Sequence, residues 1–137
     1  MRDSEALTRF ADARVARLAT AGGDGVPHLV PVTFAVSGDE IVFAVDHKPK
    51  RGTDLRRLRN IQANPAVCFL VDGYDEDWDT LWWVRADGHA TIHSDPAGRA
   101  PAVAWLRAKY GQYRERPPEG PVVRTRVTMW RHWAARD

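Results

Sequence analysis

The stretch VPHLVPVTFAVSGDEIVFAVD, residues 26–46, predicts two β-strands joined by a tight turn. Apolar residues recur at every second position from Val30 to Val36, and a period of two is typical of a half-buried strand. The segment SGDE then forms the turn, and EIVFAVD continues as the next strand. Because Pro27 and Pro31 cannot donate a hydrogen bond to a neighbouring strand, we expect the first strand to lie at a sheet edge or to carry a bulge.

Outward from this stretch, strand patterns continue on both sides and helical patterns interrupt them. We expect a short helix near the N-terminus, strands at 13–20, 66–72 and 122–133, a helix at 53–64, a long strand or bent hairpin at 81–93, and a helix from Pro96 to about Tyr113. Short turns between consecutive strands favour antiparallel pairing. Many strands with few helices predict a barrel or a sandwich, so we expect residues 1–137 to form a single, mainly β domain with flanking helices.

The composition indicates an ordinary globular protein. Hydrophobic residues make up 44% of the chain and charged residues 28%, which excludes wholesale disorder. No apolar run approaches the ~18 residues typical of a membrane span. The charged start MRDSEALTRF has no apolar core of a signal peptide, so we expect a soluble, cytoplasmic protein with no membrane partner. The lone Cys68 excludes an intramolecular disulfide and a cysteine-built zinc site.

A basic segment, KPKRGTDLRRLR at 48–59, is the strongest candidate for ligand binding. Lys48, Lys50 and Arg51 directly follow a predicted strand, and Arg57 lies near the start of the next helix, where free N–H groups also favour anions. A net charge of only +2 with such a local patch favours a small anionic ligand over nucleic acid. The alternative is a solvated helix face followed by a solvated loop.

Tryptophans surround an acidic loop, DGYDEDWD at 72–79, and form a second candidate site. Trp82 and Trp83 are adjacent in a predicted strand, so their side chains point to opposite faces. One can enter the core while the other lies in a pocket or a subunit interface, where an indole offers a flat face for a planar ring. The alternative is that both are core or dimer contacts.

Other chemistries have weaker support in the sequence. His89 and His93 share one face of a predicted strand, but two ligands without a third do not make a metal site, so we expect none. The sequence contains no nucleophile-elbow, Walker A or dinucleotide-binding motif. Cys68 falls in a buried strand, where a thiol is usually inert.

Several of these segments together resemble a known superfamily. RLAT, VPVTFAV, IVFAVDHKPK, LRRLRNIQANPAVCFLVD and YDEDWDTLWWVRADGHA are similar to the pyridoxamine 5′-phosphate oxidase-like split β-barrel flavoproteins. The forms LRRLRNIQANP and YDEDW…LWWVR most resemble its coenzyme F420-dependent, or deazaflavin, branch. The resemblance implies a six-stranded antiparallel split β-barrel, the FMN-binding split barrel, that forms a homodimer with cofactor sites at the subunit interface.

The resemblance also implies positions for the cofactor. The phosphate-anchoring lysines and arginines of the family correspond to Lys48, Lys50 and Arg57, with Arg51 in the same segment, and Thr33 lies on the strand that lines the isoalloxazine ring. Where the FMN oxidases carry a glutamine before a Val-Arg pair, this chain has Trp83. That departure is compatible with a cofactor other than FMN.

These points together predict a coenzyme F420-dependent oxidoreductase, in which a reduced deazaflavin donates a hydride to a small electrophilic substrate. The acidic tail of F420 accounts for an arginine-rich collar better than a single FMN phosphate does. Two alternatives remain: an FMN- or FAD-binding oxidoreductase of the same fold, and a non-enzymatic protein that binds a cofactor or a tetrapyrrole-like ligand. The sequence identifies no catalytic residue.

Overall fold

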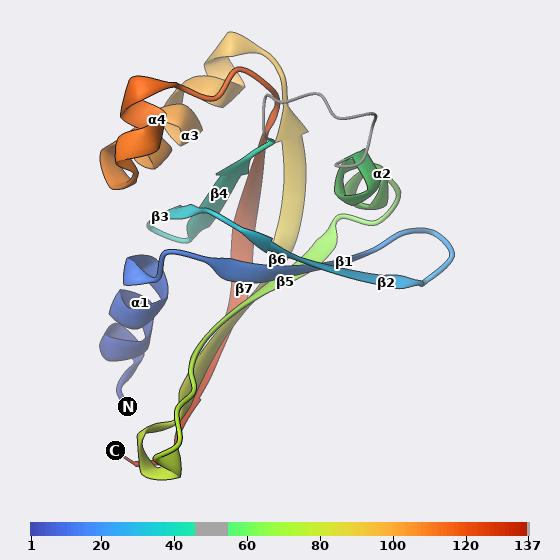
Figure 1. Cartoon of the computed structure of the whole chain (residues 1–137). Coiled ribbons are helices and arrows are strands. Elements are labelled where there is room, and N and C mark those ends of the chain that lie inside the picture. Colours follow the sequence, from blue (N-terminus) through green and yellow to red (C-terminus); the bar gives the residue numbers. More distant parts are fainter. Residues whose placement is uncertain (46–54, 137) are drawn as a thin grey trace.

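The computed structural model describes residues 1–45 and 55–136, and these form one curled, seven-stranded antiparallel sheet with flanking helices (Figure 1). The strands are β1 (Ala16–Ala21), β2 (Pro27–Val32), β3 (Ala35–Ser37), β4 (Glu40–Ala44), β5 (Ala66–Gly73), β6 (Trp82–His93) and β7 (Val122–Ala134). Their order across the sheet is β2-β1-β5-β6-β7-β4-β3. The predicted mainly β class and antiparallel pairing are therefore confirmed, and the curl is that of a split barrel.

The strand count is seven instead of the expected six, because the stretch at 26–37 divides into two strands. β2 and β3 lie at opposite ends of the strand order, so the chain crosses from one sheet edge to the other at Thr33 and Phe34. Phe34 is fully buried, and its backbone N–H donates to the hydroxyl of Tyr110 and not to a neighbouring strand. This anchoring replaces the ladder bond that would have continued β2.

The two prolines of β2 lie in an edge strand, where a residue without a backbone N–H group is tolerated. β2 is an edge strand that pairs only with β1, and Pro27 and Pro31 stand opposite Ala21 and Arg17. The predicted edge position is confirmed.

The long stretch at 81–93 forms one strand, β6, and not a hairpin. A bulge between Asp87 and Gly88 bends this strand.

In the part of the chain that the structure describes, four α-helices and one 3₁₀ turn flank the sheet. They are α1 (Asp3–Asp12), α2 (Leu55–Ala63), η1 (Trp78–Thr80), α3 (Pro96–Lys109) and α4 (Gly111–Glu115). The helix expected to continue from Pro96 to about Tyr113 is interrupted at Tyr110, whose backbone is extended. The hydroxyl of Tyr110 accepts a hydrogen bond from Phe34 N–H and donates one to the carbonyl of Arg14, and these contacts hold the break.

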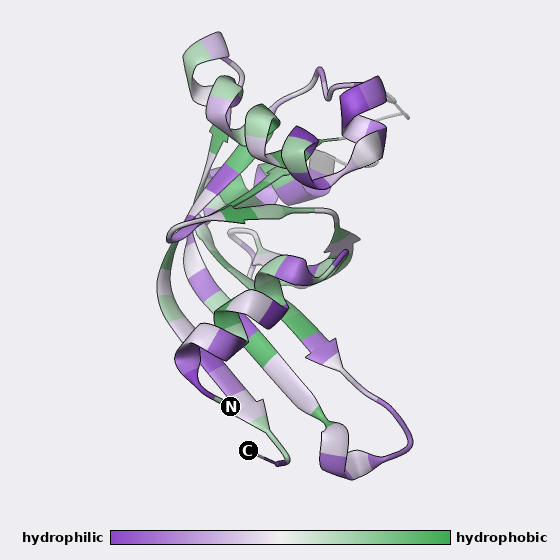
Figure 2. Cartoon of the chain, turned by 90° about the vertical axis from the view of Figure 1, so that its left-hand side faces the viewer, coloured by the Kyte–Doolittle hydropathy of each residue, from purple (hydrophilic) through white to green (hydrophobic). Residues whose placement is uncertain are grey.

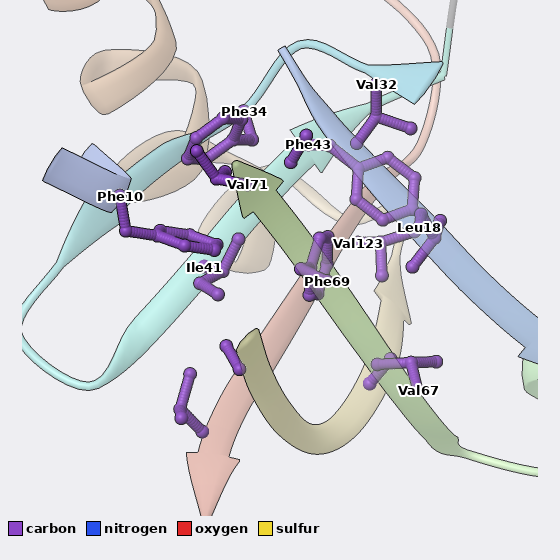
Figure 3. Close-up of a cluster of buried hydrophobic side chains, with 14 of the residues drawn as sticks. Phe10, Leu18, Val32, Phe34, Ile41, Phe43, Val67, Phe69, Val71 and Val123 are labelled. Atoms are coloured by element: carbon purple, nitrogen blue, oxygen red, sulfur yellow. The ribbon is translucent and has the colours of Figure 1, made fainter. Parts of the chain in front are cut away.

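The main core fills the inside of the curled sheet (Figure 3). Its largest side chains are four fully buried phenylalanines, Phe10, Phe34, Phe43 and Phe69. Phe10, on α1, meets Phe34 edge to face at 5.1 Å, so the N-terminal helix closes one side of the barrel. Each such side chain contributes about 1.5–3 kcal/mol through burial.

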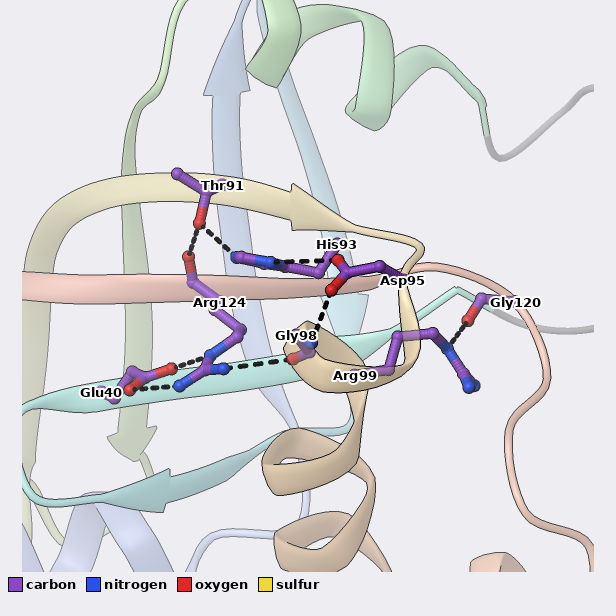
Figure 4. A network of polar contacts seen from close by, with 8 residues as sticks. All are labelled: Glu40, Thr91, His93, Asp95, Gly98, Arg99, Gly120 and Arg124. Atoms are coloured by element: carbon purple, nitrogen blue, oxygen red, sulfur yellow. Dashed lines mark hydrogen bonds and ion pairs between the residues drawn. The ribbon is translucent and has the colours of Figure 1, made fainter.

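A second, smaller core lies under α3, and a polar network fastens that helix to the sheet (Figure 4). Arg124 on β7 forms an ion pair with Glu40 on β4 and donates to the carbonyl of Gly98 in α3 at 3.1 Å. Asp95 accepts from Gly98 N–H at 3.0 Å and so caps the helix. The N-terminal end of α3 is thus fixed relative to β4 and β7.

The helix α1 carries both apolar and polar residues (Figure 2). Such an amphipathic pattern fits a helix that packs one of its faces against the sheet.

The two chain ends lie near each other in both views, and Asp3 and His132 connect them at 2.8 Å between Oδ1 and Nε2. Within the described residues, no helix combines the length and hydrophobicity that crossing a bilayer demands.

Candidate functional site

A cavity of about 370 Å³ opens where the chain crosses between the two sheet edges. We call it the Thr33 cavity; its lining residues are Pro31, Val32, Thr33, Ala44, Arg57, Tyr110, Gln112 and Tyr113. They come from β2, the Thr33–Phe34 crossing, β4, α2 and the α3–α4 segment. Four distant parts of the sequence therefore converge on one polar recess.

Two of the residues proposed from the sequence, Thr33 and Arg57, lie in this cavity together. The Nε atom of Arg57 is buried and has no hydrogen-bond partner within the described residues. A buried N–H of this kind costs about 1–3 kcal/mol when it stays unpaired. Arg57 therefore carries an unpaired buried donor, and its side chain lines the cavity.

His28, which the sequence analysis does not single out, interacts electrostatically with Arg56 and Arg57. Burial lowers the pKa of His28, and the charges of Arg56 and Arg57 lower it further. Its Nδ1 atom is also buried without a hydrogen-bond partner in the part of the chain that the structure describes. The neutral imidazole leaves the guanidinium groups as the positive charges of this region.

Tyr113 is the main lining residue that sequence reasoning missed. Its hydroxyl lies 3.1 Å from the hydroxyl of Thr33, across a sequence separation of 80 residues. The ring of Tyr113 packs edge to face against Tyr110, with 5.7 Å between centroids. A helix pattern places both tyrosines near one face, but only the break at Tyr110 brings Tyr113 to the cavity.

Three of the proposed anion-binding residues, Lys48, Lys50 and Arg51, lie outside the described residues. In the sequence they fall between Ala44 and Arg57, both of which line the Thr33 cavity.

Trp83, the remaining proposed residue, lines a different and larger hollow of about 700 Å³ on the outer face of the sheet. We call it the Trp83 concavity; it is lined by Arg17, Ala19, Leu29, Cys68, Leu70, Asp72, Gly73, Tyr74, Leu81, Trp82, Trp83, Arg85 and Trp133. Leu29 is 67% exposed there and Trp133 46%, so this chain leaves the hollow's apolar surface open.

The neighbouring tryptophans divide as their alternation predicts, since Trp82 packs against the main core while Trp83 faces outward into the concavity. The indole of Trp82 also reaches the edge of the hollow, because Gly73 has no side chain. A Cβ at Gly73 would overlap that indole.

Charged pairs surround the apolar floor of the Trp83 concavity. Arg85 Nε lies 2.9 Å from Asp87 Oδ1, and Arg17 lies 3.9 Å from Asp72. Cys68 lies on the floor, where burial and then the charge of Asp87 raise the pKa of its thiol. A protonated, half-buried thiol is a poor nucleophile, as expected for this cysteine.

In residues 1–45 and 55–136, no three His, Cys, Asp or Glu side chains gather in a way that could hold a metal ion. His89 is exposed, and the Nε2 atom of His93 lies 2.9 Å from the hydroxyl of Thr91.

Comparisons with known proteins agree with this architecture. The sequence model of the pyridoxamine 5′-phosphate oxidase family matches residues 3–134. None of the curated proteins compared with the chain matches it. Among solved structures, the conserved hypothetical protein Rv2991 from Mycobacterium tuberculosis is 27% identical with a TM-score of 0.74, covering 99% of this chain and 86% of its own.

Two further structures have the same fold at lower identity. An FAD-binding protein from Mesorhizobium loti is 21% identical with a TM-score of 0.71, covering 96% of this chain and 94% of its own. The heme storage protein HutZ from Vibrio cholerae is 15% identical with a TM-score of 0.73, covering 98% of this chain and 95% of its own.

Proposed function

Because the chain belongs to the pyridoxamine 5′-phosphate oxidase family, we propose that it is an oxidoreductase that uses coenzyme F420 bound at the Thr33 cavity. The observation that carries the proposal is the meeting of Thr33 and Arg57, from the β2–β3 crossing and from α2, in one polar recess. Both residues are cofactor contacts implied by the family resemblance of the sequence, and they lie 24 positions apart along the chain.

The donor chemistry of the Thr33 cavity fits an anionic group. Arg57 supplies a charged guanidinium, Gln112 an amide and Thr33 a hydroxyl, and no carboxylate is among the described lining residues. Charged donors of this kind form the stronger hydrogen bonds with phosphate. Lys48, Lys50 and Arg51 adjoin this group in the sequence and would extend the positive charge along a long acidic tail.

The choice of F420 over a flavin depends on Trp83 and on the arginine-rich segment. Trp83 stands where related FMN oxidases have a glutamine, which removes a contact to FMN. An FMN- or FAD-binding oxidoreductase is the second candidate, and the FAD-binding protein from Mesorhizobium loti favours it. The likeness to a heme storage protein keeps a non-enzymatic binding role as a further outcome of the test.

The protein's own contribution is to bind and orient. When bound, the deazaflavin supplies hydride chemistry toward an electrophilic substrate. Arg57 and Thr33 would hold the anionic part of the carrier, while the apolar walls at Pro31, Val32 and Ala44 exclude water on one side. No described side chain is needed as a nucleophile.

We also propose that the protein is a homodimer that buries the Trp83 concavity. An exposed leucine, Leu29, and an exposed tryptophan, Trp133, on an open apolar hollow are typical of a subunit interface. A two-fold dimer would place the same hollow on both sides of the contact. Because Trp83 of the same chain does not line the Thr33 cavity, the cofactor contact proposed for Trp83 would have to come from the partner subunit.

The direct test measures dissociation constants for F420, FMN, FAD and hemin side by side with the purified, ligand-free protein. Fluorescence titration serves for the first three and absorbance for hemin. Tightest binding to F420, with turnover of reduced F420 on a quinone-like acceptor, supports the proposal. Tightest binding to FMN or FAD moves the assignment to the second candidate, and binding of hemin alone makes the protein a non-enzymatic carrier.

A further inference from the structure

The hydroxyl groups of Thr33 and Tyr113 form a pair that points to an additional ligand contact. Their oxygen atoms are 3.1 Å apart, and each group carries one proton. Only one of the two protons is needed for the bond between them. The other is left to donate to a third atom, and both residues line the Thr33 cavity.

Tyr110 shows the contrast within the same cavity. Its hydroxyl already accepts from Phe34 N–H at 3.1 Å and donates to the Arg14 carbonyl at 2.8 Å. Its single proton is therefore committed, and Tyr110 can offer a ligand only its ring. Of the two tyrosines in the lining, Tyr113 is the one with a hydroxyl that can still serve a ligand.

The backbone around Tyr113 is fixed, so its hydroxyl has a defined position. Arg107 donates to the carbonyl of Tyr113 at 3.2 Å and to that of Arg114 at 3.1 Å. Arg114 donates back to the carbonyl of Arg107 at 2.8 Å. These bonds join α3 to α4, and the edge-to-face contact with Tyr110 orients the ring.

We propose that Tyr113 is a ligand-binding residue, and that the Thr33–Tyr113 hydroxyl pair and the guanidinium of Arg57, which line the same cavity, together bind one anionic oxygen group of the ligand. This inference rests on the proposed function in taking that group to be the phosphate of a flavin-type cofactor. It adds a contact from the segment between β6 and β7, which the sequence did not single out. A donor set from three separate elements favours phosphate over a ligand without an anionic group.

The test compares four proteins: wild type, Tyr113→Phe, Thr33→Val and the matched control Thr128→Val. Thr128 is exposed and lines neither the Thr33 cavity nor the Trp83 concavity. Dissociation constants are measured for F420, for FMN, for riboflavin, which lacks the phosphate, and for inorganic pyrophosphate. Tyr113→Phe is expected to weaken binding of F420, FMN and pyrophosphate about tenfold, the scale of one hydrogen bond to a charged group, and to leave binding of riboflavin unchanged.

Thr33→Val carries the same expectation, which keeps the test decisive if Tyr113→Phe does not fold. The double variant should lose less affinity than the product of the fold-losses of the two single variants, because the two hydroxyl groups share one free proton. The inference is overturned if the variants lose the same affinity for FMN and for riboflavin. It is also overturned if neither Tyr113→Phe nor Thr33→Val loses affinity.

Failure of the proposed function gives a different pattern. If wild type binds no flavin or deazaflavin but binds pyrophosphate, and Tyr113→Phe weakens that binding, the proposed function is rejected and the anion contact is supported. If wild type binds neither a flavin or deazaflavin nor pyrophosphate, the proposed function and the anion contact are both rejected. If flavin binding is tight and insensitive to Tyr113→Phe, only the contact from Tyr113 falls.

Discussion

The hydroxyl of Tyr110 accepts a hydrogen bond from the backbone N–H of Phe34 at 3.1 Å, across a sequence separation of 76 residues. Phe34 occupies the point where the chain leaves one edge of the sheet for the other, and Tyr110 occupies the break between α3 and α4. This one contact therefore joins the β2–β3 crossing to the break between α3 and α4. The Thr33 cavity lies beside it, lined by Thr33 and by Tyr110 itself.

Replacement of Tyr110 by phenylalanine is expected to lower the free energy of unfolding by about 1–3 kcal/mol, because it leaves the buried N–H of Phe34 unpaired. Urea unfolding measures this change. Tyr74→Phe removes an exposed hydroxyl and should change stability by less than about 0.5 kcal/mol. Equal stability of Tyr110→Phe and wild type would show that the contact contributes nothing.

Arg57→Ala is expected to weaken cofactor binding by about 1–3 kcal/mol, because the cavity loses its charged donor. Arg59→Ala is the control, since Arg59 is exposed on the same helix and does not line the cavity. Titration with F420 and FMN measures both. Lys50→Ala, outside the described residues, carries the same expectation as Arg57→Ala. Unchanged cofactor affinity in both Arg57→Ala and Lys50→Ala would show that the basic segment does not anchor the cofactor.

Leu29→Glu is expected to convert the proposed dimer into a monomer, because it places a charge on the apolar surface that the second copy would cover. Light scattering measures the mass. Val26→Glu introduces the same charge at a 47% exposed position that does not line the Trp83 concavity, and it should leave the dimer intact. A wild-type monomer that binds cofactor tightly would contradict an interfacial site.

Lys109 should make stability rise in alkaline solution. Burial and then the charge of Arg14 lower the pKa of its ammonium to about 8, while the unfolded chain keeps the ordinary value of 10.5. Between these two values the unfolded chain binds more protons than the folded one, so a rise in pH favours folding. The penalty for burying the charge is thus fully present below pH 8 and disappears toward pH 10.5.

The measurement is the difference in unfolding free energy between wild type and Lys109→Gln, taken at steps from pH 7 to pH 10.5. That difference should move in favour of wild type as pH rises. Burial raises the pKa of Tyr110 above its ordinary value of 10.0, so this hydroxyl stays protonated over most of the range and the change reports Lys109. A difference that stays constant over this range would mean that Lys109 keeps its ordinary pKa.

Local patterns were enough to place most of the strands. The alternation from Val30 to Val36 and the two prolines of β2 predicted a half-buried edge strand, because the period of side chains and the absence of an N–H act within a few residues. The adjacent tryptophans were likewise divided between core and surface by alternation alone. The same local rules predicted one strand at 26–37 and one helix at 96–113. Both predictions were wrong, because the strand divides at Thr33 and Phe34 and the helix is interrupted at Tyr110.

The sequence by itself determined the mainly β class, the family and the position of a basic segment, since these depend on periodicity, motif and charge along the chain. Only the tertiary structure decided that Thr33, Arg57 and Tyr113 share a cavity while Trp83 lies in another. The reason is physical: the closure of the sheet and the break at Tyr110 depend on contacts between residues about 80 positions apart, and no local pattern encodes such distances.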